Sequence, residues 1–135
     1  MRHYVITGHA RFSEGMASAV KLILGKKIPF VNAYVEGSED YLEQVKAEIE
    51  KHSKHEDVIV LTDVLGGSVN NEMMKIAEQA KVHLVCGVNL AFVIQLLLAD
   101  ENRRVEEVIQ ETIEEAKEGL QYCNTLIASE ELDEF

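Results

Sequence analysis

The sequence predicts an α/β domain: an open, doubly wound, mainly parallel sheet of four strands with helices on both faces. Short apolar segments alternate with longer segments of helical periodicity along the chain, which is typical of α/β folds. The segment Val58-Ile59-Val60-Leu61 is apolar at every position, as in a parallel strand covered on both faces. The length of 135 residues fits a single domain. We assign 1–128 to this domain and 129–135 to an acidic C-terminal tail.

The first half of the chain contains two strands and two helices. A helix over 12–24 follows the first strand and ends at Gly25, because glycine is common just after helix C-termini. Pro29 indicates an edge position for the second strand, since proline cannot donate a hydrogen bond to a neighbouring strand. Ser38 is expected to cap the second helix. The four expected strands are 2–7, 28–34, 58–62 and 82–86.

The second half continues this alternation. The third helix is expected to begin at the turn Gly66-Gly67-Ser68. Asn89 is expected to cap a short apolar helix that runs to Leu98, and an amphipathic helix is expected over 103–120. The segment 122–128 is expected to form a short fifth strand, antiparallel, at an edge of the sheet.

The charge of the chain argues against nucleic-acid binding. The formal net charge is −11, from 24 acidic and 13 basic residues. A polyanion would be repelled, and no basic stripe with interleaved aromatic residues offsets that repulsion. Many of the acids lie within 106–118 and 130–134, which we interpret as a solvated helix face and a soluble tail.

The sequence also favours a protein of the cytoplasm. It shows no secretory leader, and its longest apolar stretch, 90–99, is about half the length needed to cross a bilayer. Cys86 and Cys123 lie 37 positions apart and have no metal-binding spacing, so we interpret Cys86 as a structural, buried residue. We therefore expect no disulfide, no metal and no cofactor.

Candidate functional residues follow two of the predicted strands. His9 directly follows the segment Tyr4-Val5-Ile6-Thr7-Gly8. Asp63 follows Thr62 and precedes the Gly66-Gly67-Ser68 turn. Backbones of neighbouring strands lie about 4.8 Å apart, so the two side chains would be within hydrogen-bonding reach if the strands are neighbours. Ligands of doubly wound sheets collect at the carboxyl ends of the strands.

This set of residues favours phosphoryl transfer to a histidine. Asp63 would accept a hydrogen bond from one ring nitrogen of His9 and raise the nucleophilicity of the other. Gly66 and Gly67 can adopt left-handed conformations that let N–H groups converge on an anion, and Ser68 would cap the following helix. No lysine follows the turn as in a P-loop, and the chain has no serine elbow. Asp63 and the glycine pair each also have a structural interpretation, as residues of an ordinary turn.

These residues resemble the enzyme IIA domain of the mannose-type (mannose-fructose-sorbose) sugar phosphotransferase system. The segments Val5-Ile6-Thr7-Gly8-His9 and Phe12-Ser13-Glu14-Gly15-Met16 are similar to that family's first strand, active histidine and first helix. The segment Thr62-Asp63-Val64-Leu65-Gly66-Gly67-Ser68 matches its D-x-x-G-G-S turn, and Gly87-Val88-Asn89 matches its G-V-N segment. The likeness covers nearly the whole chain.

The resemblance implies a phosphocarrier. The small phosphocarrier protein HPr would phosphorylate His9, and a IIB component on a separate chain would receive the phosphoryl group. Asp63 would orient His9, while Ser68 and its glycine turn would contact the phosphoryl group. The chain would meet a membrane only indirectly, through the IIC/IID permease. The resemblance also implies a homodimer, in which 122–128 is exchanged between subunits.

The sequence departs from the family pattern at two positions. Ala10 stands where a second glycine usually follows the histidine, and Ala91 where a proline often follows the G-V-N segment. Arg11 and Phe12 would contact a partner protein; the alternative is a solvated arginine and a core side chain.

Three other functions stay open: a phosphotransfer subunit serving dihydroxyacetone kinase, a non-catalytic regulatory domain of the same fold, and a plain ligand-binding protein.

Overall fold

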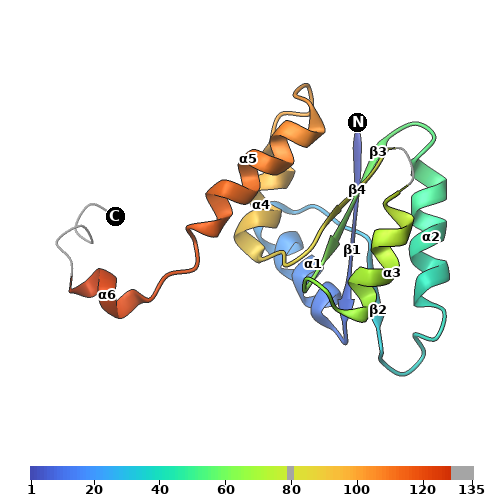
Figure 1. The fold of residues 1–135 in the computed structure, drawn as a ribbon, viewed down its shortest axis with the longest axis horizontal. Coiled ribbons are helices and arrows are strands. Elements are labelled where there is room, and N and C mark those ends of the chain that lie inside the picture. Colours follow the sequence, from blue (N-terminus) through green and yellow to red (C-terminus); the bar gives the residue numbers. More distant parts are fainter. Residues whose placement is uncertain (79–80, 129–135) are drawn as a thin grey trace.

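A parallel sheet organises the computed structural model, which describes residues 1–78 and 81–128. Within these residues four strands pair in the order β2-β1-β3-β4, and all three pairings are parallel (Figure 1). The strands are β1 (Arg2–His9), β2 (Phe30–Ala33), β3 (Asp57–Thr62) and β4 (Val82–Val85). The predicted fold class, including the edge position of the strand that follows Pro29, is therefore confirmed.

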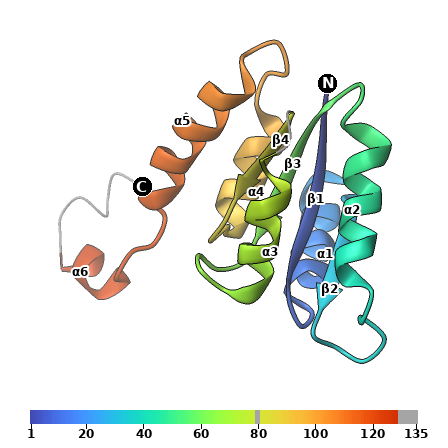
Figure 2. The ribbon, with the colours of Figure 1, turned by 45° about the vertical axis from the view of Figure 1, so that its right-hand side comes forward.

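Helices cover both faces of the sheet (Figure 2). One face packs against α1 (Phe12–Leu24) and α4 (Leu90–Leu98), with α5 (Val105–Lys117) packed on α4. The other face packs against α2 (Tyr41–His52) and α3 (Ser68–Ile76). Neighbouring residues of β1 alternate between the two cores: Ile6 belongs to the first and Val5 to the second, as the strand period of two requires. The strand β1 is therefore buried on both sides.

Local sequence signals set several element ends. Gly25 ends α1 in the left-handed conformation, at φ 71°, and its N–H donates to the carbonyl of Lys21. Asn89 caps α4, because its side-chain oxygen accepts a hydrogen bond from the N–H of Phe92 at 2.8 Å. Both caps were predicted from the sequence and are confirmed.

The strand order reverses at β1. The chain passes from β1 to β2 on one side and then returns to β3 on the other side of β1. The carboxyl ends of β1 and β3 are consequently neighbours at the switch point of the sheet, where doubly wound folds place their ligands. His9 is the last residue of β1, and Asp63 immediately follows β3.

Two predictions about element ends are wrong. Ser38 does not cap α2: the cap position is Asp40, and the Ser38 hydroxyl instead donates to the carbonyl of Val35. The segment 122–128 is not a strand but contains the short helix α6 (Cys123–Ile127). None of the residues of α6 is buried, and the helix lies apart from the sheet (Figure 1). An isolated segment satisfies its backbone hydrogen bonds within a helical turn, whereas a strand needs a partner.

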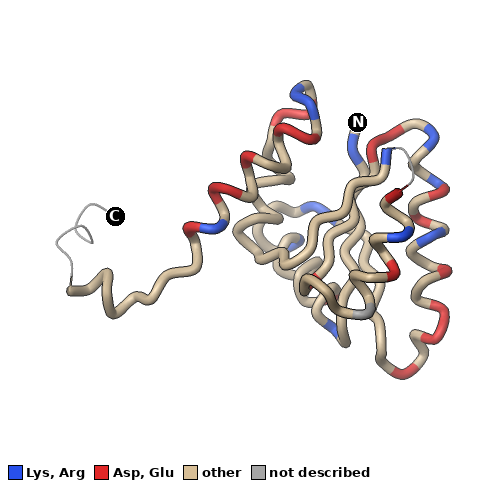
Figure 3. Tube along the Cα trace, viewed as in Figure 1, with Lys and Arg blue, Asp and Glu red and all other residues tan. Residues whose placement is uncertain are grey.

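Many of the acidic residues lie on the exposed surfaces of helices. Acidic residues line α2 and α5 (Figure 3). Glu106, Glu107, Glu111, Glu114 and Glu115 of α5 are all exposed, so the acidic stretch 106–118 is a solvated helix face as predicted. The acidic tail 129–135 lies outside the described residues. Among the described residues, no helix has the length and apolar composition that a bilayer-spanning segment requires.

Candidate functional site

The site is built around a hydrogen-bonded pair, His9 and Asp63. Nδ1 of the His9 ring lies 2.9 Å from Oδ2 of Asp63, and the backbone N–H of His9 donates to the same oxygen at 2.8 Å. The other carboxylate oxygen, Oδ1, accepts the N–H of Val64 at 3.0 Å. Both oxygens of Asp63 are therefore engaged, and the ring of His9 is held through Nδ1.

The second ring nitrogen of His9 faces the glycine turn. A Cβ built on Gly67 would lie 3.2 Å from Cε1 and 3.8 Å from Nε2 of His9, so the turn passes directly against this edge of the ring. The His9 side chain is 43% exposed, whereas that of Asp63 is 11% exposed. An incoming group can thus reach His9 from solvent while the orienting carboxylate stays covered.

The two glycines of the turn serve different purposes. Gly66 adopts φ 77°, a left-handed conformation that favours glycine. Gly67 has φ −74°, so the expectation of a left-handed Gly67 is wrong. Its missing side chain instead permits the close approach to His9, because a Cβ would also lie 2.9 Å from Cγ2 of Val64.

The turn leads into the amino end of α3. Gly67, rather than Ser68, occupies the cap position, and Ser68 is the first residue of the helix. The expected capping role of Ser68 is therefore wrong, and the position of its side chain lies outside the described part of the structure. The first N–H groups of a helix have no carbonyl partner within it, and they carry the positive end of the helix dipole. The Thr62 hydroxyl donates to Oδ1 of Asn70 at 3.0 Å and ties this helix end to β3.

Asp63 is ionised at neutral pH. Partial burial, the largest single influence, raises the pKa of Asp63, but it is outweighed by the hydrogen bonds from the backbone and ring of His9 and by the charge of that ring when protonated. The net effect lowers the pKa of Asp63 below its ordinary value. A carboxylate on Nδ1 fixes the tautomer in which Nδ1 carries the proton and leaves the lone pair on Nε2.

Gly8 is a further residue of the site that sequence reasoning did not single out. A Cβ at this position would lie 2.8 Å from Cγ of Asp63 and 3.1 Å from Cδ1 of Phe12. Only glycine leaves room for Asp63 beside β1. The signal was present in the sequence, because a glycine inside a strand often marks a close approach.

The residues that follow His9 divide into a core side chain and an exposed one. Phe12 is half-buried and packs against the core beneath α1 and α4. The Arg11 side chain is 73% exposed, and its Nη1 lies 3.0 Å from Oε1 of Glu14. Ala10 adopts φ 51°, a left-handed conformation.

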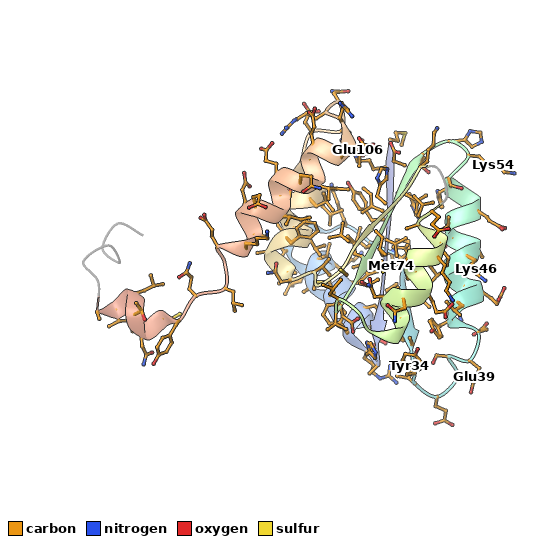
Figure 4. All side chains as sticks on the ribbon, viewed as in Figure 1. Tyr34, Glu39, Lys46, Lys54, Met74 and Glu106 are labelled. Atoms are coloured by element: carbon orange, nitrogen blue, oxygen red, sulfur yellow. The ribbon has the colours of Figure 1, made fainter. Side chains whose placement is uncertain are left out.

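Tyr34 also borders the site and was missed. Its ring centroid lies 5.4 Å from that of His9, and its hydroxyl is 3.1 Å from the hydroxyl of Tyr41. Burial, together with this hydrogen bond, raises the pKa of Tyr41 to about 12. Figure 4 shows Tyr34 at the end of the molecule where β2 finishes. Tyr34 directly follows β2, the other neighbour of β1, so topology alone could have placed it beside His9.

The geometry suits a nucleophilic imidazole. One ring nitrogen is held by a carboxylate, the other is accessible, and a helix N-terminus with a glycine turn lies next to it. Anions bind well at such helix ends. The arrangement can therefore hold a phosphoryl group against Nε2 of His9.

Comparisons with known proteins identify the family of the chain. The family model of the PTS system fructose IIA component matches residues 3–113. The PTS system mannose-specific EIIAB component of Escherichia coli (strain K12) is 26% identical over 123 residues, or 86% of this chain. The chain spans only 38% of the length of that relative. The PTS system fructose-specific EIIA component of Bacillus subtilis (strain 168) is 22% identical over 126 residues, which are 89% of this chain and 85% of that protein.

A solved structure gives the same result. A crystal structure from Klebsiella pneumoniae, of a protein provisionally named as a phosphoenolpyruvate-dependent sugar phosphotransferase system (PTS) permease, is 39% identical. It covers 93% of both chains with a TM-score of 0.84. The family model, the curated relatives and this structure agree, and the chain belongs to the IIA family of the fructose- and mannose-type phosphotransferase system.

Proposed function

We propose that this chain is a phosphocarrier that accepts a phosphoryl group on Nε2 of His9 from phospho-HPr and passes it to a IIB component during sugar uptake. The observation that carries this proposal is that the two nitrogens of the His9 ring have different surroundings. Nδ1 is held by Asp63 at 2.9 Å, while the Nε2 edge faces Gly67 and the side chain is 43% exposed.

The proposed step moves one phosphoryl group between two imidazoles. The lone pair of Nε2 attacks phosphorus, a new N–P bond forms, and the N–P bond to the histidine of phospho-HPr breaks with its electron pair. The proton on Nδ1 stays in the hydrogen bond to Asp63. The carboxylate stabilises the positive charge that develops on the ring as the bond forms. Transfer to the IIB component runs the same step in reverse on a new acceptor.

The surroundings of Nε2 would stabilise the phosphoryl group. The N–H groups in the first turn of α3 and the turn at Gly66 and Gly67 offer donors and a favourable dipole. Phosphoryl transfer depends mainly on positioning and electrostatics, so the step needs no further catalytic group from this chain.

The proposal places the protein in the cytoplasm, with the IIC/IID permease as its indirect link to the membrane.

We also propose that it works as a homodimer. Large apolar side chains near the C-terminus are exposed: Leu120 by 90%, Tyr122 by 71% and Ile127 by 70%. Such a group of side chains marks a surface that a protein partner covers.

Phosphorylation in a reconstituted system tests the proposed function. Incubation with phosphoenolpyruvate, enzyme I and HPr should give an acid-labile, alkali-stable phosphoprotein, and the His9→Ala variant should stay unlabelled. His83→Ala is the matched control, because His83 also pairs with a carboxylate, Asp57, at 3.1 Å. Labelling that persists in His9→Ala would remove His9 from the proposal, and labelling that disappears in both variants would show that its loss in His9→Ala is not specific to His9.

A further inference from the structure

A second cluster of metal-ligating side chains lies at the amino edge of the sheet, at the opposite end of β1 from His9. His3 is near the start of β1, and Glu48 and His52 lie one turn apart near the end of α2. Figure 1 shows that the start of β1 and the end of α2 reach the same end of the molecule. One ligand atom from each of the three residues lies within 4.8 Å of the others, and all three residues are half-buried.

The two histidine side chains lie close to one carboxylate oxygen of Glu48. Nε2 of His3 lies 2.9 Å from Oε2 of Glu48, and Nε2 of His52 lies 3.9 Å from the same oxygen. Ligand atoms around a tetrahedral zinc ion lie about 3.3 Å apart, given metal–ligand bonds of about 2.0 Å. The observed spacings fall on either side of that value.

The hydrogen bond on the other side of His52 leaves its Nε2 as an acceptor. Nδ1 of His52 lies 2.7 Å from Oε1 of Glu56, so Nδ1 carries the proton in the neutral ring. Nε2 of His52 then carries a lone pair 3.9 Å from the Glu48 oxygen with no proton between the two atoms, although the stacking on His3 keeps that lone pair directed away from the oxygen until the His52 ring turns. A cation placed between them would bind both. A carboxylate that holds the far nitrogen of a histidine is also the usual second partner of a metal-bound histidine.

We propose that His3, Glu48 and His52 form a zinc site, with Glu56 orienting His52. Two imidazoles and one carboxylate are a ligand set that Zn²⁺ takes in proteins, with water in the fourth position. The net charge of −11 and the C-terminal end of α2 both favour a cation. The strand rise of about 3.3 Å per residue puts His3 about 20 Å from His9. The site is therefore separate from the phosphoryl site and ties the start of β1 to the end of α2.

Binding requires a rearrangement of the two histidine rings that can be detected. The rings of His3 and His52 are stacked, with centroids 3.4 Å apart and planes 11° apart. A metal ion must lie in the plane of each ring that it binds, so the rings turn out of the stack when they share one ion. Nε2 of His3 also gives up the proton that it shares with Glu48, because only the unprotonated nitrogen binds metal.

Titration with Zn²⁺ alone, added to the metal-free protein, tests the proposal. We expect one equivalent to bind and to raise the Tm, with the ring carbon-bound protons of His3 and His52 shifting together in the NMR spectrum. His52→Asn and Glu48→Gln should each weaken binding at least about tenfold, and Glu56→Gln should weaken it about tenfold. Circular dichroism of each variant confirms that it has folded.

Two matched controls separate this site from other histidines. His55→Ala removes an exposed histidine of the same α2–β3 connection, and His9→Ala removes the phosphoryl site. Both should keep the zinc affinity of the parent protein. Lack of binding at micromolar Zn²⁺, binding that survives in the His52→Asn variant, or loss of binding in His55→Ala or His9→Ala would each overturn the assignment.

Discussion

A single oxygen of Asp63 joins the backbone and the side chain of His9. Oδ2 accepts from the backbone N–H at 2.8 Å and from the ring at 2.9 Å. The carboxylate thus fixes the end of β1 and the orientation of the ring through the same contact. Because the side chain of Asp63 is only 11% exposed, water competes little for this oxygen.

Asp63→Asn should slow phosphoryl transfer. An amide has only one acceptor oxygen and carries no charge. The variant therefore cannot accept all the hydrogen bonds that the carboxylate accepts, and it cannot stabilise positive charge on the ring of His9. We expect transfer from phospho-HPr to fall about 100-fold, within the usual range for loss of one preorganised group that stabilises developing charge. Rapid-quench measurement of the transfer rate checks this, with circular dichroism to confirm the fold. An unchanged rate would exclude Asp63 from the mechanism.

The lowered pKa of Asp63 predicts how its contribution to stability depends on pH. Above the ordinary aspartate pKa of about 3.9 the group is charged in both folded and unfolded states, so its native hydrogen bonds contribute fully. As the pH falls through the lower folded pKa, that contribution is lost. The difference in the free energy of unfolding between the wild type and Asp63→Asn should shrink as the pH falls from about 5 to below about 4. Urea unfolding across this range measures it, and a difference that grows with acidity would contradict the assignment.

Ala10→Gly should stabilise the protein. Ala10 has φ 51°, where a side chain costs about 1–2 kcal/mol and the greater backbone freedom of unfolded glycine offsets part of the relief. We expect the free energy of unfolding to rise by about 0.5–1 kcal/mol. Ala91→Gly is the control, since it places glycine in the first turn of α4 and should lower stability. A less stable Ala10→Gly variant would show that the conformation is not strained.

Sequence reasoning at this scale placed the proposed reactive residues together, but it did not find the residues that surround them. His9 and Asp63 were found because each ends a strand at a predictable edge. Gly8 and Tyr34 were missed because their roles depend on distances between elements, which a single sequence does not give. The glycine pair was correctly placed beside His9, although only Gly66 needs a left-handed conformation.

At the scale of elements, β1 and the loop after β3 approach as closely as a glycine allows. A methyl group on Gly8 would lie 2.8 Å from Cγ of Asp63. Gly8→Ala should therefore push the loop away, break the His9–Asp63 pair and reduce phosphorylation by as much as about 100-fold, the penalty that a 1 Å displacement can bring. Gly15→Ala is the control: nothing lies within 4 Å of its Cβ, and alanine should stabilise α1. Phosphorylation of Gly8→Ala at the parent rate would contradict this role.

The ends of helices were predictable where they depend on residues close by in the sequence. Gly25 and Asn89 act on atoms within four residues, so sequence spacing alone located the end of α1 and the start of α4. Ser38 has the right chemistry for a cap but bonds backward to Val35 instead. The segment 122–128 was misassigned because a strand needs a neighbouring strand, and α6 lies apart from the sheet.

At the scale of the whole molecule, the topology creates the site. Strand order β2-β1-β3-β4 was not predicted in detail, but the alternation of strands and helices predicted a doubly wound sheet with its ligands at the carboxyl edge. The reversal at β1 brings together two residues that lie 54 positions apart, His9 and Asp63. The histidine cluster at the other edge escaped prediction, because His3 meets α2 only in the folded chain.

The proposed homodimer predicts that substitutions of two similarly exposed leucines affect dimerisation differently. Leu120 near the C-terminus is 90% exposed and Leu22 on α1 is 87% exposed. We expect Leu120→Asp to shift the protein towards monomer, because a charge in the contact is costly, and Leu22→Asp to leave the dimer intact. Light scattering over a range of concentrations distinguishes them. A monomeric parent protein, or equal behaviour of both variants, would exclude this contact.

The position of the phosphoryl group on the histidine ring tests the central claim most directly. The protein, labelled with ¹⁵N in its histidines and phosphorylated through HPr, can be observed by NMR, where the coupling of nitrogen to phosphorus identifies the bonded atom. Because Nδ1 is occupied by Asp63 at 2.9 Å, the coupling should appear at Nε2 of His9. Coupling at Nδ1, or at a histidine other than His9, would contradict the account.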